Sequence, residues 1–152
     1  MTNTTHYRFH ELLHSADLVE DRLREKLAPA DIRPKQARVL NALDILGSAS
    51  QVEVARVTNV TAGSMSTMVG RLEKLGLVSR TQHPDERRCD VLSLTDAGRR
   101  QLKDVYRTWK QMDELIENTL GREKALLLAE LTDELRQALG GITPDNTSRG
   151  RQ

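Results

Sequence analysis

The sequence predicts a mainly α-helical fold with one small β-hairpin, an α+β arrangement. Two observations lead to this fold class. Apolar residues recur at steps of three and four along most of the 152 residues, as they do on one face of an α-helix. Residues 77–82 (LVSRTQ) and 89–94 (CDVLSL) are instead rich in Val, Leu, Ser and Thr, and they flank the proline-centred connection HPDERR. The length suits a single domain.

Composition narrows the class of protein. Only 3% of the residues are aromatic, so the core must be built from Leu, Val, Ala and Met. The single cysteine, Cys89, excludes an internal disulfide, and no apolar run is long enough for a signal peptide or a membrane span. We therefore expect a soluble, cytoplasmic protein without a membrane partner. No nucleophile–base pair, carboxylate dyad, phosphate loop or complete metal-ligand set is visible, so we expect no enzyme, no cofactor and no metal.

The first predicted helix starts at His6 and continues to Leu27, and Pro29 breaks the chain after it. Its apolar stripe consists of Phe9, Leu12, Ala16, Val19, Leu23 and Leu27. Pro34 suits the first position of a second helix, because proline lacks the N–H that a first turn leaves unpaired. Gly47 is the expected end of that second helix.

Two short helices joined by a tight turn come next. Ser50 and Glu53 have the spacing of a capping box, and the short helix that they begin ends near Asn59. Thr61 can cap the following helix, which Gly76 closes. Its inward face is predicted to carry Met65, Met68, Val69, Leu72 and Leu75. This order is a helix-turn-helix, and the hairpin that follows is a β-wing.

A long helix then begins at Thr95 and Asp96 and keeps its apolar period to Leu120. Gly121 marks a bend, and a last helix ends at Gly140. A helix of more than six turns in a small domain usually packs on a partner, so we expect the long apolar helices at both chain ends to need one. Residues 141–152 have no apolar period and are predicted to be disordered.

The polar face of the second short helix predicts contact with DNA. In a helix-turn-helix this helix enters the major groove, and its first residues reach base edges and phosphates. Small and hydrogen-bonding residues occupy that face here, with positive charge towards its end. The predicted DNA-contacting residues, including the basic residues of the hairpin, are Thr61, Gly63, Ser64, Ser66, Thr67, Arg71, Lys74, Arg80, Arg87 and Arg88.

The hairpin tip carries two arginines, Arg87 and Arg88, either of which can enter the adjacent minor groove. Phosphates would repel the neighbouring Asp85 and Glu86 if these faced DNA. We therefore expect the two acids to hold the arginine side chains in place by charge-assisted hydrogen bonds.

Residues 61–102 resemble the recognition helix, wing and following helix of the MarR family, bacterial winged-helix regulators of antibiotic-resistance, stress and aromatic-catabolism genes. The shared features are RLEKLGLV at the helix end, the acidic-x-Arg pattern in DERR, and LT followed by DAGR. The acidic-x-Arg spacing fits Asp85 with Arg87 or Glu86 with Arg88, and counting forward to LT favours Arg88. With the flanking helices included, the resemblance covers residues 6–140.

The resemblance implies a homodimer whose first and last helices, 6–33 and 96–140, interleave as the dimerisation region. Residues 34–95 would form the winged DNA-binding domain. Such proteins usually repress a promoter by binding a pseudo-palindromic double-stranded site, and a small ligand or an oxidant releases them. The alternative that the sequence leaves open is a winged-helix protein-interaction module without sequence-specific DNA binding.

Several residues allow two interpretations. His6, His10 and His14 share one side of the first helix, where they either bind a metal or anion or form a polar flank beside the dimer contact. Cys89 is either a small strand residue or a redox sensor whose thiolate is favoured by the neighbouring arginines. Gly63 and Gly70 either weaken their helix or allow a close approach to phosphate.

A ligand site is the remaining candidate. Trp109 and Tyr106 on the long helix and Arg38 on the second helix could border the family's cleft between dimer helices and winged domain. A small aromatic or anionic effector would then be bound by His10, His14, Arg38 and Trp109. Trp109 also falls on the apolar stripe, which favours a core or dimer contact.

Overall fold

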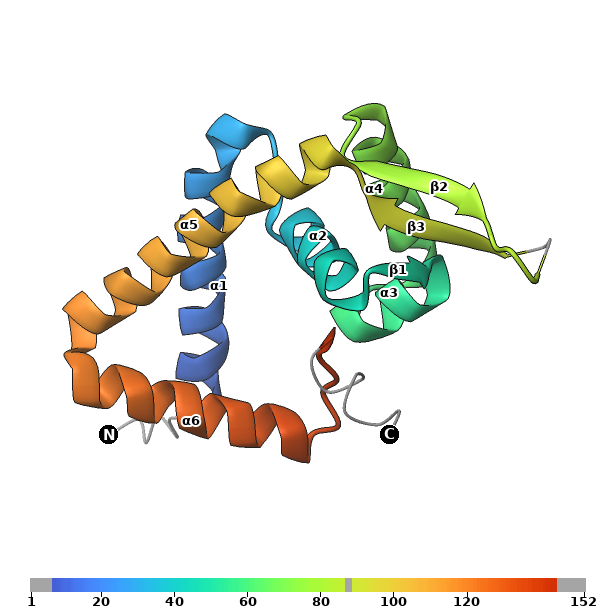
Figure 1. The fold of residues 1–152 in the computed structure, drawn as a ribbon. Helices are drawn as coiled ribbons and strands as arrows, with labels where there is room; N and C mark the ends of the chain where they lie inside the picture. Colours follow the sequence, from blue (N-terminus) through green and yellow to red (C-terminus); the bar gives the residue numbers. More distant parts are fainter. Residues whose placement is uncertain (1–6, 87–88, 145–152) are drawn as a thin grey trace, which may run out of the picture.

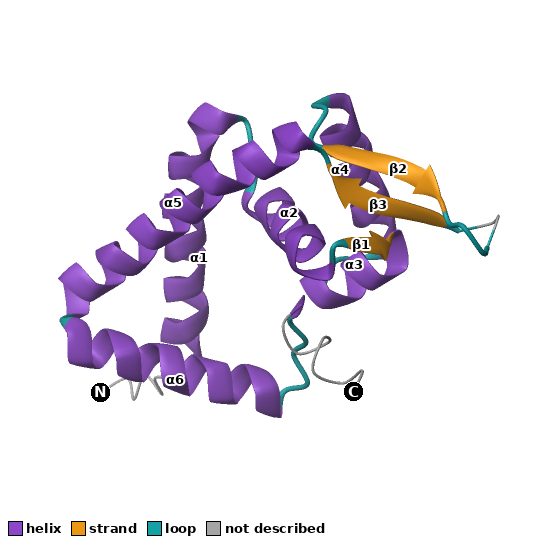
Figure 2. Cartoon of the chain, in the orientation of Figure 1, coloured by secondary structure: helices purple, strands orange, loops and turns teal. Residues whose placement is uncertain are grey.

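The structure is a computed structural model of the chain and describes residues 7–86 and 89–144 (Figures 1 and 2). The described elements, in chain order, are α1 (Phe9–Leu27), the 3-10 turn η1 (Ala28–Ala30), α2 (Pro34–Leu46), β1 (Ser48–Ser50), α3 (Gln51–Thr58), α4 (Ala62–Lys74), β2 (Val78–Gln82), β3 (Asp90–Leu94), α5 (Asp96–Leu120) and α6 (Arg122–Ala138). The predicted fold class, mainly helical with a small sheet and a wing, is confirmed.

The helices divide into two regions in Figure 1. α2, α3, α4 and the sheet gather at one end, and α5 leads away from β3, crosses α1 and meets α6. Figure 2 shows the strands confined to the end of the molecule that carries α3 and α4. None of the helices within the described ranges is long and apolar enough to cross a membrane.

The sheet has three antiparallel strands in the order β1-β3-β2. The predicted hairpin is present as β2 and β3, with Val78 opposite Leu94. The short strand β1 is an addition that the sequence did not predict, because three residues are too few to show an alternating pattern. It pairs Ser48 with Ser93, whose hydroxyl oxygens lie 2.8 Å apart.

The helix starts follow the predicted caps. Pro34 is the first residue of α2. Ser50 and Glu53 form the capping box: the Ser50 Oγ accepts from the Glu53 N–H (3.2 Å), and the Glu53 carboxylate accepts from the Ser50 N–H (3.0 Å). Thr61 caps α4 and Thr95 caps α5 through their hydroxyl oxygens. α1 begins at Phe9, three residues later than predicted, and His6 lies outside the described residues.

The core lies under the winged region and contains mostly aliphatic side chains. α2 supplies Leu40 and Leu43, α4 supplies Met65 and Leu72, and β3 supplies Leu92; all five are fully buried. The start of α5 closes this core with Leu102 and Val105. Two residues that were predicted to face inward with Met65 do not do so: Met68 is only half-buried, and Leu75 is exposed just after the end of α4.

The apolar residues of α1 and α6 are largely exposed within one chain. On α1, Phe9 is 55% exposed and Leu13 57%, whereas Leu27 at the other end is buried. α6 buries none of its residues, and Leu131 is 53% exposed. Exposed apolar helices of this length are typical of surfaces that a partner covers. The predicted boundaries, 6–33 and 96–140 for dimerisation and 34–95 for DNA binding, stay predictions.

Candidate nucleic-acid interface

The exposed face of α4 is the centre of the candidate interface. The Thr61 Oγ1 accepts from the Ser64 N–H (3.3 Å), which begins the helix, and Met65, Val69 and Leu72 turn the opposite face into the core. The Thr67 Oγ1 donates to the Gly63 carbonyl (3.3 Å). The predicted contact residues of the first two turns are all exposed: Thr61, Gly63, Ser64, Ser66 and Thr67. The helix therefore presents small polar groups on the side away from the core.

The two glycines of α4 leave open space beside the helix. A Cβ at Gly63 or Gly70 would meet no atom within 4 Å. Packing inside the chain therefore requires neither glycine, although each lowers the propensity of α4 to form. Their absent side chains leave the backbone of this face accessible to another molecule.

Arg71, a predicted phosphate contact, is already engaged within the chain. Its Nη2 forms an ion pair with the Asp31 Oδ1 (2.7 Å) and lies 3.4 Å from the Asp31 carbonyl oxygen. Asp31 has a left-handed backbone (φ 54°) at the end of η1. The pair therefore joins α4 to the connection between α1 and α2. Lys74 lies one turn further along α4 and is exposed.

A cleft of about 910 Å³ lies beside α4, between the end of α1 and the start of α2. Ser64, Thr67 and Arg71 line it together with Arg33 and Lys35, the two basic residues that flank Pro34. Arg33 and Lys35 were not among the residues predicted to contact DNA. The signal was the RPK run at a helix start, where basic side chains join the exposed N–H groups of the first turn.

Arg80, another predicted DNA contact, lies on β2 with its guanidinium held by three side chains. Nε donates to Glu73 (3.1 Å), Nη1 to Asp90 (3.4 Å) and Nη2 to Gln51 (3.4 Å). The hydrogen bond to Glu73 is the main cause that raises the pKa of Arg80 above its ordinary value. The Arg80 charge is thus compensated inside the chain.

The wing turn is organised by His83. Its Nδ1 accepts hydrogen bonds from the backbone N–H groups of Asp85 (3.1 Å) and Glu86 (3.2 Å). The backbone N–H of His83 donates to the Cys89 carbonyl (2.8 Å), which continues the pairing of β2 and β3. Arg87 and Arg88 lie outside the described residues. Their insertion into a groove, and their support by Asp85 and Glu86, stay predictions.

Cys89 lies next to acidic groups, and this argues for a small strand residue over the alternative of a redox sensor with a favoured thiolate. The Glu86 side chain accepts a hydrogen bond from the exposed thiol and raises the pKa of Cys89, and the charges of Glu86 and Asp90 act in the same direction. A raised pKa lowers the thiolate fraction at neutral pH, which is the opposite of what a reactive sensor needs.

The predicted effector residues are not gathered around one cavity. His10 and His14 are exposed on α1, and the His10 ring contacts the Phe9 ring (centroids 4.3 Å apart). Trp109 is half-buried against the core, beside Tyr106 (5.8 Å). Arg38 lines a separate cleft of about 760 Å³ between α2, α3 and residues 139–144, and that cleft is lined by none of His10, His14 and Trp109.

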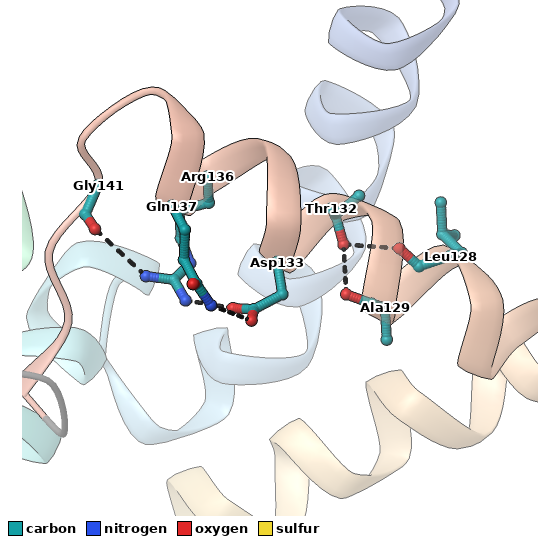
Figure 3. A network of polar contacts seen from close by, with 7 residues as sticks. All are labelled: Leu128, Ala129, Thr132, Asp133, Arg136, Gln137 and Gly141. Atoms are coloured by element: carbon teal, nitrogen blue, oxygen red, sulfur yellow. Dashed lines mark hydrogen bonds and ion pairs between the residues drawn. The ribbon is translucent and has the colours of Figure 1, made fainter.

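The end of α6 borders this Arg38 cleft through a short polar network (Figure 3). Arg136 forms an ion pair with Asp133 and lies near the Gly141 carbonyl, and Gln137 also donates to Asp133. Arg136 lowers the pKa of Asp133. Residues 141–144, the start of the predicted disordered tail, line the cleft, whereas residues 145–152 lie outside the described part.

A metal site is not evident in residues 7–86 and 89–144, where no group of three or more His, Cys, Asp or Glu side chains could hold an ion. His6 lies outside these ranges, so binding by the row of three histidines is untested.

Fold and surface together define a winged helix-turn-helix protein, and comparison with known proteins identifies its family. A family profile described as MarR family matches residues 30–88. The regulator FarR of Neisseria gonorrhoeae is 30% identical over 124 residues, 82% of this chain and 85% of FarR. The repressor MdtR of Bacillus subtilis is 30% identical over 132 residues, 87% of this chain and 85% of MdtR. The chain belongs to the MarR family of transcription regulators.

A solved structure agrees with this assignment. The crystal structure of NadR in complex with 4-hydroxyphenylacetate is similar with a TM-score of 0.69 and 29% identity, over 89% of this chain and 96% of NadR. FarR and MdtR are named as transcription regulators of the helix-turn-helix type. The expectation that the chain is not an enzyme agrees with that class.

Proposed function

We propose that the chain is a homodimeric repressor that binds a pseudo-palindromic DNA site in the cytoplasm and is released by a small effector. The open face of α4 carries this proposal, because its first turns expose hydroxyls and bare backbone on a helix supported by the core. A side chain or backbone group on that face can reach base edges in a major groove. One relative, MdtR, is named as a transcriptional repressor.

The exposed apolar faces of α1 and α6 support a homodimer. Leu126, Leu131 and Leu139 are 62%, 53% and 79% exposed, which is costly for a chain that stays alone in water. A two-fold dimer would carry two copies of α4, and such symmetry matches two half-sites about one helical turn apart, ~34 Å.

The effector is proposed to be a small aromatic acid. NadR is described as a complex with 4-hydroxyphenylacetate, a ligand with one ring and one carboxylate. In this chain Arg38 lies in a cleft of mixed lining, in which Val57 and Ile142 supply apolar surface, and it can pair with a carboxylate there. Binding that favours a different spacing of the two α4 helices would lower DNA affinity by the difference in binding free energy.

DNA selection with the purified protein is the direct test. We expect a symmetric consensus with two half-sites, and an affinity that falls steeply as salt rises, since phosphate contacts release counterions. Thr67→Ala should relax base preference, whereas Lys74→Ala should weaken binding to all sequences and flatten the salt dependence. Equal affinity for selected and random duplexes would reject sequence-specific regulation and favour a protein-interaction module.

The dimer and the effector need separate measurements. Sedimentation should give twice the chain mass, and Leu131→Asp should give monomers, while Glu130→Gln on the same helix serves as control. In the presence of 4-hydroxyphenylacetate as probe, operator affinity should fall for the wild-type protein and change less for Arg38→Ala. An effect of equal size in both proteins would remove Arg38 from the effector site.

A further inference from the structure

Arg80 connects the three elements that present the DNA-binding surface. It lies in the middle of β2, opposite Leu92 of β3. Nε reaches Glu73 on α4, Nη1 reaches Asp90 at the start of β3, and Nη2 reaches Gln51 at the start of α3. Every nitrogen of the guanidinium therefore has a partner on a different element, and these elements are the two helices of the helix-turn-helix and the wing strand.

The charges around Arg80 argue against a direct phosphate contact. Two carboxylates, Glu73 at 3.1 Å and Asp90 at 3.4 Å, surround a single guanidinium, so the group of three carries net negative charge. A phosphate brought to this group would meet repulsion from both acids. The Arg80 and Glu73 side chains are each about one-third exposed, so water screens this pair only in part.

The network around Arg80 constrains geometry more than it adds stability. Ion pairs that are partly exposed contribute little to the free energy of unfolding. A planar guanidinium with three fixed donor directions does, however, restrict how its partners can lie relative to one another. Here it restricts the angle between α4 and the β2–β3 hairpin, the two elements that must enter neighbouring grooves together.

We propose that Arg80 is a positioning residue that sets the angle between the recognition helix and the wing through Glu73, Asp90 and Gln51. This inference rests on the proposed function, because the positioned elements matter only if they bind DNA. Lysine at this position would keep the charge, but its three donors share one rotatable nitrogen, so it could not hold the three acceptors in the fixed, separate directions of a planar guanidinium.

The test compares Arg80→Lys and Arg80→Ala with the wild-type protein on the selected duplex, by fluorescence anisotropy over a series of salt concentrations. Both variants should weaken binding by roughly tenfold, the scale of one lost base contact, while the slope of log affinity against log salt stays unchanged. Lys74→Ala is the control for a phosphate contact, and its slope should fall by about one.

A double-mutant cycle tests whether Arg80 acts through Glu73, with the positive charge at position 80 kept in place. Glu73→Gln combined with Arg80→Lys should weaken binding no more than Arg80→Lys alone. The arrangement of residues 73 and 80 is already lost in the single variant, so the second substitution has nothing further to remove. Circular dichroism and urea unfolding check that each variant folds, and the isosteric Glu73→Gln alone carries the test if Arg80→Ala does not fold.

Two outcomes would overturn the inference while the proposed function stands. Wild-type affinity of Arg80→Lys would show that charge alone is needed, as at a phosphate contact. A salt slope that falls by about one in Arg80→Ala would show the same. If the wild-type protein binds no duplex selectively, the proposed function fails, and the positioning role fails with it.

Discussion

Gly98, in the first turn of α5, lies directly against the backbone of Leu77. A Cβ at Gly98 would be 2.1 Å from the Leu77 carbonyl oxygen, far inside any allowed contact. Two hydrogen bonds hold the same place: the Thr95 N–H donates to the Leu77 carbonyl (3.1 Å), and the Thr95 hydroxyl donates to the Gly76 carbonyl (2.6 Å). The glycine of the DAGR motif is therefore a packing requirement that joins α5 to the winged region.

Gly98→Ala should destabilise the protein, because the added methyl group can be accommodated only if α5 moves away from Leu77. We expect a loss of about 1–3 kcal/mol in the free energy of unfolding, the usual cost of overpacking. Urea unfolding monitored by circular dichroism measures it. Gly70→Ala, also within a helix but with open space around it, is the control, and a similar stability for both variants would contradict the argument.

Gly63→Ala should separate stability from DNA binding. The site is open, so alanine should stabilise α4 by about 0.4–1 kcal/mol through reduced freedom of the unfolded chain. If the first turn of α4 approaches DNA closely, the same methyl group should weaken binding. Gly70 lies about two turns further from the end that enters the groove, so Gly70→Ala should weaken binding less. Unchanged affinity of Gly63→Ala would place the contact elsewhere.

His83 should be replaceable by asparagine but not by glutamine. The asparagine side-chain oxygen can accept from the backbone of Asp85 and Glu86 much as His83 Nδ1 does, in the manner of an Asx turn. Glutamine carries its amide one carbon further out. We expect His83→Gln and His83→Ala to cost about 0.5–1.5 kcal/mol of DNA-binding free energy, the value of a lost hydrogen bond. Equal binding by all three variants in an anisotropy titration would show that the turn does not depend on the ring.

Cys89 should react slowly with alkylating agents at neutral pH. Its pKa is raised, mainly by the Glu86 hydrogen bond, so the thiolate fraction at pH 7 is lower than in an unperturbed thiol. Replacing Glu86 with glutamine removes the negative charge, lowers the pKa and should speed iodoacetamide labelling, which mass spectrometry can follow across pH. Asp85→Asn is a matched control. Labelling of the wild-type protein faster than a free thiol at pH 7 would restore the sensor hypothesis.

The features that the sequence predicted are those with a local cause. The side chains of Ser50 and Thr61 cap the backbone three residues further on, at Glu53 and Ser64, so both caps are visible in the pattern of letters. The inward face of α4 follows in the same way from its helical period for Met65, Val69 and Leu72, whereas the predictions for the half-buried Met68 and the exposed Leu75 were wrong.

What could not be predicted depends on contacts between distant positions. Arg71 meets Asp31 across 40 positions, and Arg80 meets Gln51 across 29. Sequence alone therefore marked both arginines as basic groups available to DNA, without showing that each already has an acidic partner inside the chain. Cys89 is a local exception: Glu86 and Asp90 are close to it in the sequence, but the letters do not show which of the neighbouring charges face the thiol.

Because α5 is long, the contact at Gly98 determines where the opposite end of the helix lies. Its 25 residues run from Leu77 and the sheet to the exposed Leu115 and Leu120 beside α6. At a rise of 1.5 Å per residue the helix is about 37 Å long, so a tilt of roughly 3° about Gly98 displaces its far end by about 2 Å. The close contact between Gly98 and Leu77 therefore fixes the direction of the whole helix and, with it, the position of its far end.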